Sequence, residues 1–230
     1  MSNAIITGTS RGLGRALAEK LLSCGWSVCG LSRTSSGIKH QSYTEYLLDV
    51  TDESAVRNVV KLISQNSSPI DLLVNNAGAA SMNAFLLTPA KKAESLINLN
   101  YLGTFHCMQA IGKLMVHQRR GLIINITTVA VPLSLAGEAA YVASKAAVDA
   151  LTKVAAGELK SQGISVIGLG FGPMDTDLTR AVNKEKLAEI NQRISRPYGT
   201  TLCQAVDFIL DHLSKESIST GNIYYLGEIP

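Results

Sequence analysis

Short apolar runs alternate with helical patterns along almost the whole chain, and this alternation constrains the fold more than any other feature. The strand-like runs are AIIT (4–7), SVCGLS (27–32), EYLLDV (45–50), IDLLVNNA (70–77), GLIINITT (121–128), ISVIGLGF (164–171) and GNIYYLG (221–227). Helices are expected over 12–23 and 53–65, through Phe105 and Met115, and around Tyr141. Such alternation is typical of βαβ units, and continuous apolar runs indicate strands buried on both faces. The sequence therefore predicts an α/β fold with a doubly wound parallel sheet of about seven strands in three layers.

The composition fits one globular domain. Of the 230 residues, 46% are hydrophobic, and the chain has no internal repeat, low-complexity tract or Pro/Gly/Ser-rich linker. We therefore expect a single domain over 1–230. The formal net charge of +3 is too small, and the Lys and Arg residues are too scattered, to indicate nucleic acid binding.

The four cysteines indicate neither disulfides nor a metal site. Cys24, Cys29, Cys107 and Cys203 form no Cys-x-x-Cys pair, and no His lies at metal-ligand spacing from them. The apolar run at the N-terminus is short and has no basic region before it. The longest uncharged stretch, 121–137, is shorter than a membrane span. These features predict a cytoplasmic protein with no metal and no membrane segment.

A glycine-rich turn joins the first predicted strand to the first predicted helix. Gly8, Gly12 and Gly14 give the spacing G-x-x-x-G-x-G. Glycine lets such a turn tighten and lets the backbone approach a pyrophosphate closely, and the N-terminus of the next helix offers free N–H groups. The turn therefore predicts nucleotide binding, with a purely structural turn as the alternative.

Four motifs in register resemble the short-chain dehydrogenase/reductase family. TGTSRGLG (7–14) is similar to its cofactor loop, NNAG (75–78) to the motif after its fourth strand, and YVASK (141–145) to its Tyr-x-x-x-Lys pair. Asn100, within NLNYLGTF, matches its active-site asparagine. The resemblance covers essentially the whole chain. It implies a Rossmann-like fold, a nicotinamide cofactor and an oxidoreductase that acts on carbonyl and alcohol groups.

Tyr141 and Lys145 lie four positions apart, so on a helix they share one face. A phenol ionises at about pH 10, and a nearby ammonium lowers its pKa and so suits it to general acid–base catalysis. The resemblance implies that Tyr141 gives its proton to a substrate carbonyl oxygen and that Lys145 holds the nicotinamide ribose. It also implies that Asn100 holds a water in a proton relay. The alternatives are a Tyr and a Lys that cap a buried helix and an Asn that bonds locally.

Thr128 stands where the family usually carries a serine, thirteen residues before the tyrosine. Threonine keeps the hydroxyl, but it adds a methyl group and restricts χ1. By resemblance, this hydroxyl bonds the substrate oxygen or the reactive phenol. We expect Thr128 to take this role, because alternation along the strand points Thr127 to the other face.

The end of the second strand bears on the choice of cofactor. Domains that prefer NAD place Asp or Glu about twenty residues past the glycine loop, on the ribose 2′-hydroxyl. Ser32 stands there, Arg33 follows it, and Arg11 lies inside the glycine loop. Guanidinium groups suit a 2′-phosphate because they are planar and always charged. The prediction is NADP(H), with two solvated surface arginines as the alternative.

The resemblance assigns the remaining site residues by position. Asp49 and Val50 would contact the adenine, with helix capping as an alternative for Asp49. Backbone groups around Met174, together with Thr176, would hold the nicotinamide carboxamide, although Phe171 stands where the family has Pro. The predicted cofactor-binding set is Gly8, Ser10, Arg11, Gly12, Leu13, Gly14, Ser32, Arg33, Asp49, Val50, Asn76, Ala77, Gly78, Tyr141, Lys145, Pro173, Met174 and Thr176. The predicted catalytic set is Asn100, Thr128, Tyr141 and Lys145.

Ligands of open α/β sheets bind at the carboxyl ends of the strands, so the loops there should hold the substrate. An apolar pocket for a neutral or lipophilic carbonyl compound is expected from Phe85, Leu86, Leu133, Leu135 and Met174. The stretch from Asp177 to Arg196 has a charged helical pattern. By resemblance, residues of about 175–199 form a substrate lid, with a plain surface helix as the alternative.

Three interpretations of the function remain open. The first is an NADPH-dependent oxidoreductase that reduces a small-molecule carbonyl, or oxidises the alcohol, as a homodimer or homotetramer. The second is a reductase of 3-oxoacyl chains on acyl carrier protein, which would need a basic patch that Arg119, Arg120 and Lys160 do not obviously supply. The third is a non-catalytic NADP(H)-binding sensor or scaffold, which the Thr128 substitution and the altered Pro-Gly region favour.

Overall fold

The described residues form one parallel sheet of seven strands. The computed structural model describes residues 2–65, 68–174, 176, 183–215 and 217–229. The strands are β1 (Asn3–Thr7), β2 (Ser27–Ser32), β3 (Tyr43–Leu47), β4 (Leu72–Asn75), β5 (Gly121–Thr128), β6 (Ile164–Phe171) and β7 (Ile223–Tyr225). Their order is β3-β2-β1-β4-β5-β6-β7, and every neighbouring pair is parallel. The predicted doubly wound parallel sheet is therefore confirmed.

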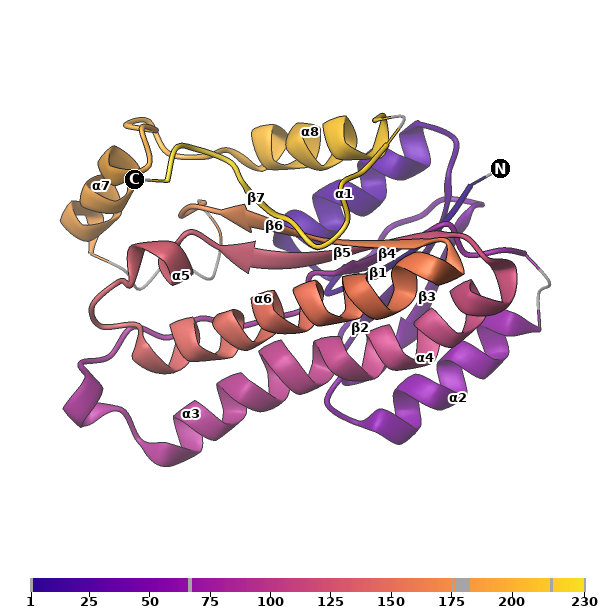
Figure 1. Ribbon diagram of the computed structural model, residues 1–230, viewed down its shortest axis with the longest axis horizontal. Helices are drawn as coiled ribbons and strands as arrows, with labels where there is room; N and C mark the ends of the chain where they lie inside the picture. The colour runs from indigo at the N-terminus through magenta and orange to yellow at the C-terminus, as the bar shows by residue number, and fades with distance from the viewer. Residues whose placement is uncertain (1, 66–67, 175, 177–182, 216, 230) are drawn as a thin grey trace.

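Helices cover both faces of the sheet and give the predicted three layers (Figure 1). The helices are α1 (Gly12–Ser23), α2 (Glu53–Ser64), η1 (Phe85–Leu87), α3 (Ala90–Leu96), η2 (Ile97–Leu102), α4 (Gly103–Gln118), α5 (Ala130–Leu133), α6 (Ala139–Leu159), η3 (Lys160–Gln162), α7 (Lys184–Arg193) and α8 (Leu202–Leu213). α1 and α8 pack on one face, and α2, α4 and α6 pack on the other. The carboxyl ends of β5 and β6 point toward α5 and α7 (Figure 1).

Successive residues of the central strands face opposite layers. In β1, Ile6 belongs to the core beneath α1 and α8, whereas Ile5 belongs to the core beneath α2, α4 and α6. In β4, Leu72 and Leu73 divide in the same way, and all four side chains are at most 1% exposed. A strand with a side-chain period of two and a helix layer on each side needs apolar residues at every position. This requirement explains the continuous apolar runs of the sequence.

Side-chain caps fix where two of the helices begin. The carboxylate of Asp52 accepts hydrogen bonds from two backbone N–H groups in the first turn of α2. Thr201 and Gln204 form a reciprocal capping box at the start of α8. Asp49 therefore does not cap α2, so the alternative role considered for it is wrong. α8 itself was not among the predicted helices.

Some boundaries differ from the prediction because edge strands have one neighbour only. β3 starts two residues before the predicted run of 45–50 and ends at Leu47, which leaves Asp49 and Val50 in the following turn. Of the predicted lid, residues 175 and 177–182 lie outside the described residues, and α7 spans Lys184–Arg193. Across the described part of the chain, the helices are all too short or too polar to span a bilayer.

The glycine-rich turn packs tightly against the segment that follows β4. Gly8 has a φ of +76°, in the left-handed region that favours glycine. A Cβ on Gly14 would lie 2.4 Å from the carbonyl oxygen of Gly8 and 2.4 Å from Nδ2 of Asn76. The absence of a side chain at Gly14 thus lets the first turn of α1 approach both β1 and the end of β4.

We predict that Gly14→Ala destabilises the protein by about 1–3 kcal/mol, because the backbone oxygen of Gly8 cannot yield to a methyl group. Gly157→Ala is the matched control, since Gly157 lies in α6 and a Cβ added there would meet nothing within 4 Å. The control should stabilise by about 0.5–1 kcal/mol through helix propensity. Chemical denaturation measures both changes, and equal effects of the two substitutions would contradict the packing argument.

Candidate active site and cofactor cleft

A cavity of about 860 Å³ opens at the carboxyl ends of the strands and runs from the glycine-rich turn to Tyr141 and Lys145. The predicted cofactor residues that line it are Gly8, Ser10, Arg11, Gly12, Leu13, Ser32, Arg33, Asp49, Val50, Asn76, Ala77, Gly78, Tyr141, Lys145, Pro173, Met174 and Thr176. Gly14 is not a lining residue, because it packs against Gly8 and Asn76. Of the predicted catalytic residues, Thr128 lines the cavity and Asn100 does not.

The Thr7 side chain joins the end of β1 to the segment that follows β4. Its hydroxyl accepts hydrogen bonds from the backbone N–H groups of Asn76 (3.0 Å) and Ala77 (2.9 Å). The side-chain amide of Asn76 donates in return to the backbone oxygen of Thr7 at 2.9 Å. These bonds hold NNAG against the glycine-rich turn. Thr7 was not among the predicted site residues, and its place directly before Gly8 is the one signal in the sequence that could have indicated its role.

Asn100 is fully buried in the π-helical turn η2, between α3 and α4. Its side-chain oxygen accepts from the Ala79 N–H at 2.9 Å. Its amide donates to the Ala79 oxygen at 2.9 Å and to the Ser144 hydroxyl at 2.8 Å. Asn100 therefore fixes the cavity wall at Ala79 against α6. π-helical turns occur frequently at functional sites, and neither this turn nor Ser144 was predicted.

Lys145 is 6% exposed, and its ammonium donates to the backbone oxygen of Ile126 at 2.7 Å. Burial lowers the pKa of Lys145 to about 8, and the carboxylate of Asp149, one helical turn further on, opposes this shift. Asp149 is also buried, and burial raises its own pKa. The lysine is thus close to its titration point near neutral pH.

Tyr141 is 9% exposed, and burial raises the pKa of its phenol to about 12. A hydrogen bond with the Thr128 hydroxyl lowers this pKa, and the Glu138 carboxylate raises it. The expectation that Lys145 brings the phenol pKa below its ordinary value is therefore wrong for this structure. The physical reason is that desolvation of the phenolate outweighs the favourable contacts.

Thr128 is buried at the end of β5, beside the Tyr141 phenol. Its hydroxyl also accepts a hydrogen bond from the Ala130 N–H at 3.2 Å. Thr127 lines the cavity as well, but the hydroxyl that lowers the pKa of the phenol is that of Thr128. A threonine hydroxyl can therefore reach Tyr141 from this position.

At the opposite end of the cavity, polar side chains follow β2 and β3. Ser32 donates from its hydroxyl to the Thr34 backbone oxygen at 2.8 Å, which turns the chain outward. Nη1 of Arg33 lies 3.9 Å from Oδ2 of Asp49, and 66% of the Arg33 side chain is exposed. The other carboxylate oxygen of Asp49 accepts from the N–H and the hydroxyl of Thr51. This end combines a guanidinium with hydroxyl groups, as a phosphate would require.

The apolar wall of the cavity differs in part from the prediction. Met174 and Leu135 line the cavity, but Leu133, which is buried in the same cluster as Leu135, does not. Phe85 and Leu86 are 74% and 90% exposed and do not line it. Both side chains face solvent, so this part of the prediction is wrong. Two residues of α7, Leu187 and Ile190, contribute instead.

A dinucleotide fits the residues that the cavity brings together. The close packing at Gly8 and Gly14 leaves a backbone cradle where side chains would intrude, beside the N-terminus of α1. The cavity volume is typical of a pocket for a large ligand. Among the described residues, no group of three His, Cys, Asp or Glu could hold a metal ion.

Known proteins resemble the chain over most of its length. A curated 3-oxoacyl-[acyl-carrier-protein] reductase, FabG of Vibrio harveyi, is 34% identical over 193 residues, which cover 80% of this chain and 78% of that protein. The solved structure of ElxO with NADP bound has a TM-score of 0.87 at 28% identity and covers 98% of this chain and 96% of its own. Ligand-free aldohexose dehydrogenase of Thermoplasma acidophilum has a TM-score of 0.86 at 26% identity, covering 98% of this chain and 92% of its own.

The family comparison agrees with the motifs and with the sheet. The family model for short chain dehydrogenases matches residues 2–187, which include the glycine-rich turn, NNAG, Asn100 and YVASK. The family model matches most of the chain, and the chain is 34% identical to FabG over 193 residues. A similarity of this extent indicates common membership of a family and not a shared fold alone. The chain belongs to the short-chain dehydrogenase/reductase family, whose members are NAD(P)-binding oxidoreductases.

Proposed function

We propose that the protein is an NADPH-dependent reductase that converts the carbonyl group of a small molecule to an alcohol, or catalyses the reverse. One observation carries the proposal. A single cavity has Tyr141, Lys145 and Thr128 at one end and the glycine-rich turn with Arg11 at the other. A dinucleotide bound along this cavity would bring its reactive ring to the phenol. The bound nicotinamide would supply the hydride, and the protein would supply orientation and a proton.

In the proposed reaction Tyr141 is the proton donor. With a pKa of about 12 the phenol is protonated at neutral pH, so it can give its proton to a carbonyl oxygen that gains negative charge. The Thr128 hydroxyl, which lies near the phenol, would orient the same oxygen. Lys145, held by the Ile126 carbonyl, would stabilise the phenolate that remains and return a proton to it.

Asn100 takes a positioning role in this proposal. The oxygen and the nitrogen of its side-chain amide are both occupied, by Ala79 and Ser144, so the side chain holds the wall of the cavity at a fixed distance from α6. The water relay that the family resemblance implies stays a prediction. So do the remaining assignments of the cofactor set, including Asp49 and Val50 at the adenine and Pro173, Met174 and Thr176 at the carboxamide.

The choice of NADP(H) over NAD(H) rests on charge. Arg11 and Arg33 both line the adenosine end of the cavity, and Ser32 replaces the carboxylate that would repel a 2′-phosphate. The similarity to ElxO, whose structure holds NADP, supports this choice. The ion pair of Arg33 with Asp49 is long and exposed, so it would give way to a phosphate at little cost.

Four further expectations belong to the same proposal. Residues of about 175–199 would form a lid, which is supported by the two α7 residues that line the cavity, Leu187 and Ile190. The apolar lining at Leu135 and Met174 favours a neutral substrate. A homodimeric or homotetrameric state and a cytoplasmic location remain predictions.

A second candidate function is the reduction of 3-oxoacyl chains on acyl carrier protein, which the 34% identity to FabG favours. An acidic carrier protein would need basic residues beside the cavity. Arg119 and Arg120 precede β5, and Lys160 precedes β6, so these three lie at the amino ends of the strands. The cavity opens at the carboxyl ends, and we therefore rank this function second.

A non-catalytic NADP(H)-binding sensor is the remaining alternative. It would keep the glycine-rich turn but would have no need of a buried Tyr141, Lys145 and Thr128 around one phenol. Turnover of any carbonyl substrate excludes the sensor, whereas NADPH binding without turnover across a broad carbonyl panel favours it.

Tyr141→Phe should lower the turnover of carbonyl substrates with NADPH by about 10²–10⁴-fold, because the proton donor is lost. NADPH binding should stay within about twofold, since the ring remains in place. Tyr46→Phe is the matched control, because Tyr46 lies on β3 outside the cavity and should show no effect. Steady-state rates and fluorescence titration with NADPH measure the two quantities. Undiminished turnover in Tyr141→Phe would rule out the proposed mechanism.

Thr128→Ser should retain activity, and Thr128→Val should lose most of it, about tenfold or more, since valine keeps the shape and removes the hydroxyl. The comparison uses kcat with one carbonyl substrate and saturating NADPH. Equal rates for Thr128→Val and the parent protein would show that the hydroxyl takes no part in catalysis.

The rate of carbonyl reduction should fall as the pH rises through about 8, because Lys145 then loses its proton while Tyr141, with a pKa of about 12, keeps its own. Asp149→Asn should move this fall to lower pH, since the Asp149 carboxylate raises the pKa of Lys145. Glu158→Gln, which replaces an exposed carboxylate on the same helix, is the control. A pH profile of kcat that is identical for all three proteins would contradict the assignment.

A further inference from the structure

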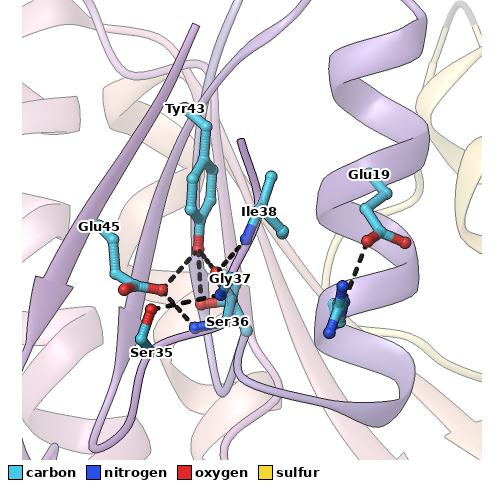
Figure 2. Close-up of polar contacts among 9 residues, drawn as sticks. Glu19, Ser35, Ser36, Gly37, Ile38, Tyr43 and Glu45 are labelled. Carbon is cyan, nitrogen blue, oxygen red and sulfur yellow. Dashed lines mark hydrogen bonds and ion pairs between the residues drawn. The ribbon is translucent and has the colours of Figure 1, made fainter. Parts of the chain in front are cut away.

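The Tyr43 phenol lies where three segments of the chain meet. Tyr43 starts β3, and its ring points toward the turn formed by Ser35, Ser36 and Gly37 (Figure 2). The hydroxyl of Ser36 donates to the phenolic oxygen at 3.2 Å. The phenol donates to the hydroxyl of Thr9, in the glycine-rich turn, at 3.1 Å, with Glu45 as a second acceptor at 3.4 Å.

Glu45 binds the backbone of the same turn through its side chain. Its carboxylate accepts the Ser36 N–H at 2.7 Å, which is a short, charge-assisted bond. Burial opposes ionisation, but hydrogen bonds from Ser36, Ser35 and Tyr43 lower the pKa of Glu45 below its ordinary value. The turn closes on itself as well, because the Ile38 N–H donates to the Ser36 hydroxyl at 3.2 Å (Figure 2).

The space for this network comes from a glycine in β2. A Cβ on Gly30 would lie 2.1 Å from the Tyr43 hydroxyl and 2.5 Å from the Thr9 hydroxyl. Thr9 itself is completely buried. The phenol thus crosses over β2 and ties together two segments that are far apart in sequence.

Each of the two tied segments carries an arginine of the cavity. Arg11 lies two residues after Thr9, and Arg33 lies three residues before Ser36. Both line the adenosine end of the cavity, but neither Tyr43 nor Glu45 does. The network therefore holds together the two segments that carry these arginines, and it does so from outside the cavity. Fixing the partners before binding lowers the conformational entropy lost when a ligand binds.

We infer that Tyr43, supported by Ser36 and Glu45, is a positioning residue that sets the preference for NADPH by holding the Arg11 and Arg33 segments at the spacing of a 2′-phosphate. This inference rests on the proposed function for its ligand. The inference assigns a role in cofactor selection to residues of β3 and of the turn before β3, which lie outside the cavity.

The test measures dissociation constants of NADPH and NADH by fluorescence, for which Trp26 supplies the protein signal. The parent protein should bind NADPH more tightly than NADH. Tyr43→Phe, which removes the phenolic oxygen alone, should weaken NADPH binding by about five- to tenfold, the range expected for one or two lost hydrogen bonds. NADH binding should change by less than about twofold, because NADH lacks the 2′-phosphate that distinguishes NADPH.

Tyr46→Phe is the matched control, because Tyr46 lies on the same strand but belongs with the core beneath α2 and α4. It should leave both constants unchanged. Ser36→Ala removes one partner of the phenol with a smaller change in packing, and it should repeat the selective loss. Thermal unfolding shows whether each variant is folded, so a failure of Tyr43→Phe to fold leaves Ser36→Ala to decide.

The outcomes separate the inference from the function on which it rests. A parent protein that binds NADH at least as tightly as NADPH overturns the proposed cofactor and, with it, the phosphate role of the network. A parent protein that prefers NADPH, with variants that weaken both cofactors equally or neither, overturns the inference alone. Selective loss of NADPH binding in Tyr43→Phe and Ser36→Ala, but not in Tyr46→Phe, supports it.

Discussion

The reversal of strand order between β1 and β4 is the constraint on which the site depends. Connections leave these two neighbours in opposite directions, so their carboxyl ends are left uncovered and a crevice forms between them. The Thr7 hydroxyl bridges the crevice floor by accepting two backbone N–H groups from the end of β4. With these bonds, two loops that each leave a strand become one rigid surface. These bonds fix the position of the glycine-rich turn relative to NNAG, and the other residues of the cavity lie around these two segments.

Burial decides the chemistry at the other end of the cavity. The phenol of Tyr141 and the ammonium of Lys145 both leave water for the protein interior, and desolvation moves their pKa values in opposite directions, to about 12 and about 8. Each group is thereby biased toward its neutral form. A neutral phenol is a proton donor, and a lysine near its titration point can both lose and regain a proton. In the proposed reaction, a protonated tyrosine would therefore suit reduction better than a preformed phenolate.

Much of this arrangement could be predicted from the sequence, for a definite reason. Motifs such as YVASK depend on spacing along a helix, and the glycine-rich turn depends on local backbone geometry, so both can be recognised in the sequence. Contacts between segments that are distant in the sequence cannot be recognised in this way. The bond of Ser144 with Asn100, the clamp at Thr7 and the Tyr43 network join residues separated by up to 70 positions, through ordinary hydroxyl groups. The prediction that Phe85 and Leu86 line the substrate pocket failed for the same reason, because the hydrophobicity of a side chain does not show which way its loop turns. The Tyr141 pKa was misjudged because neighbouring charge is visible in the sequence and depth of burial is not.

The π-helical turn at Ile97–Leu102 has a consequence for how this chain tolerates change in length. A π-turn holds one residue more than an α-helical turn, so it takes up an extra residue while the helices on either side keep their phase. In this chain, Asn100 lies in that turn and meets both Ala79 and Ser144, while α4 keeps its apolar face on the sheet. Loss of one residue from η2 would restore a regular α-helical turn, so α3 and α4 could keep their packing while Asn100 lost its position. A change in length at this point would therefore act on the wall of the active site and spare the hydrophobic core.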